Sequence, residues 1–264
     1  MRRAGKNFAL IMNAVMERTA NLLTPLPTVM LLGLPVHRLD MNAALDVIDG
    51  FVRGGTPHHV VTADASMLVM AAEDAELRDI IARADLVTPD SIGVLWAAKR
   101  AGKPIAERVS GVVIVEQLCA RSAERNYRLF FLGAAPGVAE LAAERMTAKY
   151  PGCQVVGTRD GFFTPDDVPE ITATIRNSRA DIVCVAMGIP KQEKWIARYR
   201  DELGASVLIG VGGTLDVLSG TVKRAPVVFQ KLKLEWLWRV ISNPKKISKV
   251  MLLPRFVKRV LRGE

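Results

Sequence analysis

Short apolar runs alternate with longer amphipathic stretches along most of the chain. The short runs predict strands, and because they are almost continuously apolar we expect both faces of the sheet to be buried. They cover residues 28–39, 58–65, 85–90, 127–133, 153–161, 180–188 and 205–213. The stretches between them predict helices over residues 40–55, 66–84, 91–102, 111–126, 138–152, 165–178 and 190–204.

This alternation predicts an α/β fold with a Rossmann-like, mostly parallel sheet and helices on both of its faces. We expect one such domain over residues 28–220, because the alternation stops near Gly220. For residues 221–264 we predict a basic helical C-terminal appendage. For residues 1–27 we predict a leader, either an amphipathic helix or a mobile segment. A signal peptide is disfavoured because the apolar stretch is short and lacks a small-residue cleavage site.

The net charge of +9 is concentrated in the appendage. Residues 221–264 hold twelve lysines and arginines against two acids, a net charge of +10, whereas the first 220 residues hold 24 basic and 25 acidic residues. This asymmetry indicates an anionic partner: a membrane surface, a polyphosphate or a nucleic acid. Trp236, Trp238 and Phe256 lie among the cations, which favours an interfacial membrane anchor.

The cysteines and the hydropathy limit the class of protein further. Cys119, Cys153 and Cys184 are far apart, with no CxxC and no cluster with histidine, which argues against a disulfide framework and a structural zinc site. No apolar run approaches the roughly 18 to 20 residues that a membrane-spanning helix needs. The sequence therefore predicts a protein of the reducing cytoplasm without a structural zinc site, and we expect no cofactor.

Polar residues follow the predicted strands, at the sheet edge where open α/β folds bind ligands. Thr62 and Asp64 follow one strand and Asp90 follows the next. Two carboxylates in one cleft are typical of acid–base catalysis or a metal site. Each aspartate also stands where it could cap the next helix, so both interpretations stay open at this point.

Two further loops at the same edge are candidates for ligand binding. The segment GAAPG, from Gly133 to Gly137, places glycines before a helix, as in a phosphate-binding turn, although a plain tight turn has the same pattern. The segment GIPKQEKW (188–195) places Gln192, which can both donate and accept hydrogen bonds, on the first turn of a helix. The chain contains no D-x-D motif, so the cations of the appendage are candidates for stabilising a diphosphate.

Several segments in this order together resemble the WecG/TagA/CpsF family of bacterial glycosyltransferases, glycosyltransferase family 26. The resemblance runs from about residue 28 to near the end of the chain. The segments are TAD (62–64), ADLVTPDSIGV (84–94), ERVSG (107–111), FFLGAAPGVAE (130–140), GTRDGFF (157–163), GIPKQEKWIA (188–197), GVGGTLDVLSG (210–220) and KRAPVVFQKLKLEWLWRV (223–240).

The resemblance implies roles for individual residues. Asp90 matches the proposed general base, Thr62 and Gln192 match polar residues of the same pocket, and Arg108 matches a nearby basic residue. In the appendage, Arg239 matches an arginine that reaches over the diphosphate, and the neighbouring basic positions are Lys246 and Lys249. Asp64 departs from the family, which usually has asparagine there. The two lysines stand where arginine is common, and lysine does not make the bidentate phosphate contacts that arginine makes.

The resemblance also implies the reaction and its partners. It implies an inverting, metal-independent transfer of a hexose or N-acetylhexosamine from a UDP-sugar to a sugar carried on a polyprenyl diphosphate. The protein would lie peripherally on the cytoplasmic face of the membrane, held by residues 221–264, with no nucleic-acid partner; a homo-oligomer is compatible with the sequence. The alternatives are a nucleic-acid-binding α/β protein with a basic arm and an NAD-linked oxidoreductase.

Overall fold

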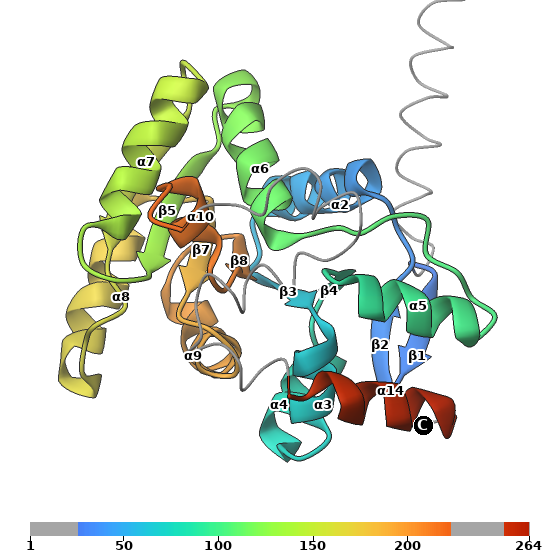
Figure 1. Ribbon diagram of the computed structural model, residues 1–264. Coiled ribbons are helices and arrows are strands. Elements are labelled where there is room, and N and C mark those ends of the chain that lie inside the picture. Colours follow the sequence, from blue (N-terminus) through green and yellow to red (C-terminus); the bar gives the residue numbers. More distant parts are fainter. Residues whose placement is uncertain (1–25, 223–250, 264) are drawn as a thin grey trace, which may run out of the picture.

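A six-stranded parallel sheet forms the centre of the computed structural model, which describes residues 26–222 and 251–263 (Figure 1). The strand order is β4-β3-β8-β7-β5-β6, and every neighbouring pair is parallel. The strands are β3 (His58–Ala63), β4 (Leu86–Pro89), β5 (Arg128–Gly133), β6 (Gln154–Arg159), β7 (Ile182–Ala186) and β8 (Val207–Gly210). The predicted α/β class and parallel sheet are confirmed.

Helices cover both faces of this sheet, which is why its strands are apolar throughout. One face carries α2 (Met41–Gly54), α6 (Gly111–Arg125), α7 (Val138–Lys149) and α10 (Thr214–Leu218). The other carries α3 (Ala65–Ala71), α4 (Ala75–Ala82), α5 (Ile92–Arg100), α8 (Val168–Ser178) and α9 (Lys191–Tyr199). Figure 1 shows α2 and α6 on one side of the sheet and α9 on the other.

The predicted strand over residues 28–39 is instead a hairpin. β1 (Thr28–Leu31) and β2 (Leu34–His37) pair with each other in antiparallel register, outside the main sheet. The turn between them places Leu32 at φ 50° and Gly33 at φ 75°. Two successive residues with positive φ are typical of a tight hairpin turn. The prediction was wrong because Leu32 is apolar and hides the turn in an otherwise continuous apolar run.

The predicted helical stretch over residues 66–84 is two helices, α3 and α4. The break falls at Asp74, whose side chain accepts a hydrogen bond from the backbone N–H of Leu77 at 3.0 Å and so caps α4. By contrast, the predicted limits of α2 are confirmed. Asp40 caps its start, and Gly55 ends it in the left-handed conformation at φ 72°.

The described end of the chain forms α14 (Leu253–Leu261), which packs against α3. Phe256 is 1 % exposed and lies in the core that α3 and α5 share. Its ring packs against that of Trp96, with 6.5 Å between the ring centroids. Phe256 therefore does not belong to a membrane-facing set of aromatic residues, as the sequence suggested. Val257 and Leu261 do point to solvent. Across residues 26–222 and 251–263, no helix is long and apolar enough to cross a membrane.

Candidate functional site

The candidate site lies where the connections after neighbouring strands leave to opposite faces of the sheet, the place at which open α/β folds hold ligands in a crevice. β3 is followed by α3 on one face, and β8, its neighbour, is followed by α10 on the other. The ends of these two strands are tied together by Thr62, whose hydroxyl donates to the carbonyl oxygen of Gly210 at 2.7 Å. The predicted residues Thr62, Asp64 and Asp90 therefore lie at one sheet edge.

Asp90 does not cap the helix that follows it. That cap is Ser91, whose hydroxyl oxygen accepts from the backbone N–H of Val94 at 3.3 Å and of Ala65 at 3.2 Å. The Oδ2 atom of Asp90 instead accepts from the backbone N–H of Gly111 at 3.3 Å, at the start of α6. A helix N-terminus carries a partial positive charge, which favours the ionised carboxylate that a general base must be.

Asp64 is a helix cap. Its Oδ1 atom accepts from the hydroxyl of Ser66 at 2.6 Å and from the backbone N–H of Met67 at 2.8 Å, at the start of α3. Of the two interpretations of this residue, the capping one is therefore confirmed. Its predicted contact with substrate stays a prediction.

Two threonine hydroxyls lie close to Gly111, the residue whose N–H contacts Asp90. A Cβ atom added to Gly111 would lie 3.5 Å from the hydroxyl oxygens of both Thr62 and Thr214. Both threonines are buried. Each hydroxyl donates to a backbone carbonyl, Thr62 to Gly210 and Thr214 to Val211, so each oxygen can still accept a hydrogen bond. Gly111 was not singled out from the sequence, where its signals are its place in the ERVSG segment and the Ser-Gly pair before a helical stretch.

Gln192 connects two loops of the site. Its Oε1 atom accepts from the backbone N–H of Gly188 at 3.0 Å and of Gly212 at 2.9 Å, and its Nε2 donates to Glu193 at 2.7 Å. The side chain is 1 % exposed. Gln192 uses both its donor and its acceptor, and the partners seen here are backbone groups and a neighbouring carboxylate; its predicted contact with substrate stays a prediction. Gln192 therefore fixes the loops after β7 and β8 relative to each other.

The GAAPG loop lies at the same edge, further along the sheet. Gly133 has φ 122°, and a Cβ atom there would come within 2.5 Å of the carbonyl of Ala186, so only glycine fits. Gly137 is the N-cap of α7, makes no side-chain cap and has φ 80°. β5 is three strands from β3, about 14 Å at about 4.8 Å per strand. A ligand that touches both Thr62 and this loop must therefore be extended.

Comparison with known proteins identifies the family to which the chain belongs. A sequence profile described as "Glycosyl transferase WecG/TagA/CpsF family" matches residues 29–264. The chain belongs to this family. It is also 35 % identical over 205 residues to a protein of Bacillus spizizenii named N-acetylglucosaminyldiphosphoundecaprenol N-acetyl-beta-D-mannosaminyltransferase, with 78 % of this chain and 79 % of the relative covered.

Membership of the WecG/TagA/CpsF family makes the protein a glycosyltransferase, which confirms the resemblance found in the sequence. The two rival predictions, a nucleic-acid-binding protein and an NAD-linked oxidoreductase, are not supported. The predicted roles of individual residues are not tested by these comparisons and stay predictions.

The basic residues predicted for this glycosyltransferase site divide into two groups. Arg108 is half-buried, and the backbone N–H of the next residue, Val109, donates to the carbonyl of Pro89 at 3.0 Å. The segment with Arg108 is thus held against the end of β4, directly before Asp90. The predicted appendage cations lie outside the described residues: they are Arg239, Lys246 and Lys249. Within the described part of the chain, no three His, Cys, Asp or Glu side chains are grouped so that they could hold a metal ion.

Proposed function

We propose that the protein transfers a hexose or N-acetylhexosamine from a UDP-sugar to a sugar carried on a polyprenyl diphosphate, with inversion at the anomeric carbon and without a metal ion. The observation that carries this proposal is the Asp90 carboxylate at the start of α6, 3.3 Å from the Gly111 N–H and beside the Thr62 hydroxyl. The relative's name includes both a polyprenyl-diphosphate-linked sugar and an N-acetylmannosaminyl group, which supports the acceptor class and makes N-acetylmannosamine the first donor to test.

In the proposed reaction, Asp90 removes the proton from the acceptor hydroxyl as its oxygen attacks the anomeric carbon. The bond to the UDP oxygen breaks, and the diphosphate leaves with the negative charge. We assign part of the stabilisation of that charge to the backbone N–H groups at the start of α7, behind Gly137, which an extended UDP can reach from the Asp90 end of the site. We assign the remaining stabilisation to Arg239, Lys246 and Lys249, which lets the reaction proceed without the metal clamp that a D-x-D motif would provide.

The test is UDP release from a panel of UDP-sugars, with and without a polyprenyl-diphosphate-linked N-acetylglucosamine acceptor. We expect acceptor-dependent release with one N-acetylhexosamine donor, the same rate in excess EDTA, and a product whose anomeric configuration, read by proton NMR, is opposite to that of the donor. Loss of activity in EDTA that returns with a divalent cation would contradict metal independence. Retention of configuration would contradict the role of Asp90 as a base.

We also propose that the protein binds peripherally to the cytoplasmic face of the membrane through residues 221–264. In α14, the exposed Val257 and Leu261 lie beside exposed Lys258 and Arg262, a combination typical of interfacial helices. Each basic residue near an anionic surface contributes about 1 kcal/mol, so the Lys258→Gln/Arg262→Gln variant should bind anionic vesicles about 30-fold more weakly.

Sedimentation with phosphatidylglycerol vesicles measures this binding. A matched control is Arg176→Gln/Arg179→Gln, two exposed arginines of the described body. Equal loss in both variants would point to a diffuse charge effect and contradict a role of the appendage. Substitutions are preferable to truncation after Gly220, because truncation would also remove Phe256 from the core.

A further inference from the structure

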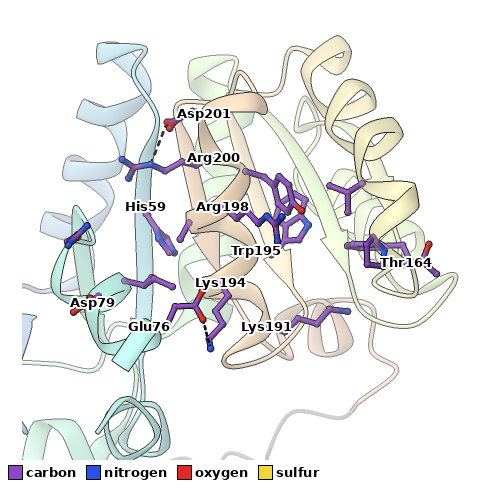
Figure 2. Close-up of a pocket in the computed structure, with 17 residues that line it drawn as sticks. His59, Glu76, Asp79, Thr164, Lys191, Lys194, Trp195, Arg198, Arg200 and Asp201 are labelled. Carbon is purple, nitrogen blue, oxygen red and sulfur yellow. Dashed lines mark ion pairs between the residues drawn. The ribbon is translucent and has the colours of Figure 1, made fainter. Parts of the chain in front are cut away.

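A hollow of about 1000 Å³ lies along α9, apart from the candidate site that holds Asp90 (Figure 2). It is lined by α9, by α4 and by the segment that leads into α8. Figure 2 shows Lys191 and Lys194 near one end of this stretch and Arg200 and Asp201 at the other. The hollow lies on the face of the sheet opposite α6 and α10, whereas Thr62 lies beside Gly111 at the start of α6, on the other face.

Two buried polar atoms at this hollow have no hydrogen-bond partner within residues 26–222 and 251–263: Nε2 of His59 and Nε1 of Trp195. Their side chains are 2 % and 7 % exposed. Buried polar groups are normally hydrogen-bonded, because leaving one unpaired is costly. An indole N–H can only donate, so it requires an acceptor atom such as a carbonyl oxygen. Burial, together with the nearby positive charge of Arg200, lowers the pKa of His59 to about 3, so its imidazole is neutral and can donate or accept.

The charges around the hollow are balanced, which argues against a strongly charged ligand. Five cations line it, and five carboxylates lie in or directly beside the lining: Arg83, Lys191, Lys194, Arg198 and Arg200 against Glu76, Asp79, Asp201, Asp74 and Asp85. Lys194 lies 2.8 Å from Asp74 and 2.7 Å from Glu76. Arg200 lies 3.8 Å from Asp85 and 3.6 Å from Asp201. A ligand here meets hydrogen-bond donors and acceptors of both signs, with little net charge. A neutral ligand rich in hydroxyl groups matches such a lining, because each hydroxyl both donates and accepts.

Aromatic rings form part of the same lining. Trp195 contacts Phe163 at 6.4 Å and Tyr199 at 5.4 Å between ring centroids, and Lys191 lies 5.3 Å from the ring of Phe163. The lining therefore offers an apolar surface beside the unpaired indole N–H. A sugar ring has one apolar C–H face, and an acetamido group adds a carbonyl acceptor and a methyl group.

We propose that the hollow along α9 is a second saccharide-binding site, which takes neutral oligosaccharides that contain N-acetylated amino sugars. The Trp195 N–H donates to the acetamido oxygen, and His59 exchanges a hydrogen bond with a ring hydroxyl. Both atoms are covered in the structure, so exposed side chains of α9, Arg198 among them, move aside on binding. The proposal rests on the proposed function in one respect: a transferase of N-acetylhexosamines encounters such sugars as acceptor or product.

The experiment is a titration of the full-length, ¹⁵N-labelled protein with N,N′-diacetylchitobiose and with chitotetraose, followed through the indole N–H signals in NMR spectra. The Trp195→Phe variant, which keeps a ring and removes the N–H, assigns the signal. We expect the Trp195 signal to shift, with or without saturating UDP, and the variant to bind about 3- to 10-fold more weakly, the value of one neutral hydrogen bond. The matched control is Trp96→Phe, at a partly exposed tryptophan on α5, which should bind like the wild type.

A Trp195 signal that does not move, or equal affinity in Trp195→Phe and Trp96→Phe, would overturn the proposal. If Trp195→Phe does not fold, Arg198→Ala at an exposed lining position replaces it, and a 3-fold or smaller change together with an unmoved indole signal counts against the site. Failure of the transfer assay contradicts the proposed function whatever the titration shows. A failed titration with normal transfer removes only the second site.

Discussion

Asp64 and Asp90 follow neighbouring strands in register, since Ala63 pairs with Pro89, yet their carboxylates have different surroundings. Asp64 turns back onto its own chain and caps α3. Asp90 leaves the capping of α5 to Ser91 and reaches a helix that begins 21 residues later. The two connections differ in which residue caps the helix: where Ser91 takes over the cap, the Asp90 carboxylate makes its hydrogen bond to a helix far along the chain.

The largest effect expected from this comparison is that of Asp90→Asn. Asparagine still accepts from the Gly111 N–H but cannot act as a base, so turnover should fall by about 10²- to 10⁴-fold. The free energy of unfolding should hardly change. Acceptor-dependent UDP release and urea denaturation measure the two quantities, and a turnover within twofold of the wild type would reduce Asp90 to a structural residue.

Gln192→Leu is expected to have the next largest effect, on stability. The substitution removes the shared acceptor of the Gly188 and Gly212 N–H groups, and each buried, unpaired donor costs about 1–3 kcal/mol. We therefore expect a loss of about 2–5 kcal/mol in the free energy of unfolding, measured with urea. Gln117→Leu, at an exposed position on α6, is the control and should change stability by less than about 0.5 kcal/mol. A similar small change in Gln192→Leu would show that the loops do not depend on this bridge.

We expect stability to depend on pH through His59, near the start of β3 and thus at the opposite end of that strand from Asp64. The pKa of His59 falls to about 3 on folding, mainly because of burial, whereas the unfolded chain takes up a proton near pH 6.5. This contribution to stability is complete above pH 6.5 and is lost as the pH falls from 6.5 towards 3, by at most about 1.4 kcal/mol per pH unit. Urea denaturation at several pH values measures the slope, which should flatten in His59→Leu. An unchanged slope in His59→Leu would contradict the assignment of this pH dependence to His59.

Asp64 provides the smallest expected effects and completes the comparison. Asp64→Ala removes the cap of α3 and should cost about 1 kcal/mol, whereas Asp64→Asn keeps a capping oxygen and should cost only a few tenths of a kcal/mol. Thermal unfolding measures both. Equal destabilisation by the two substitutions would show that the negative charge, and not the cap, is what matters at this position.

The sequence predicts regular elements well and long-range contacts poorly. The limits of α2 follow from Asp40 and Gly55, which act within a few residues. The hairpin turn at Leu32 is hidden because its apolar side chain continues the pattern of the strands. The hydrogen bond between Asp90 and Gly111 joins residues 21 apart. No local pattern encodes such a distance.

The same distinction between local and long-range information holds for the candidate site. That Asp64, Asp90 and Gln192 gather at one sheet edge follows from their places after parallel strands. What each does there depends on the loop that faces it: Gln192 is occupied by the N–H groups of Gly188 and Gly212, which come from two different connections. The burial of Phe256 could not be predicted either, because a basic, aromatic segment has the same composition whether it faces a membrane or the core.

The most direct test of the central claim is a single-turnover measurement of sugar transfer by Asp90→Asn and Asp64→Asn, each under conditions where the variant is fully folded. Both substitutions remove one negative charge from the same sheet edge, so a general electrostatic effect would slow them alike. We predict that Asp90→Asn slows transfer by about 10²-fold or more, while Asp64→Asn stays within about tenfold of the wild type. Equal rates in the two variants would contradict the assignment of Asp90 as the base.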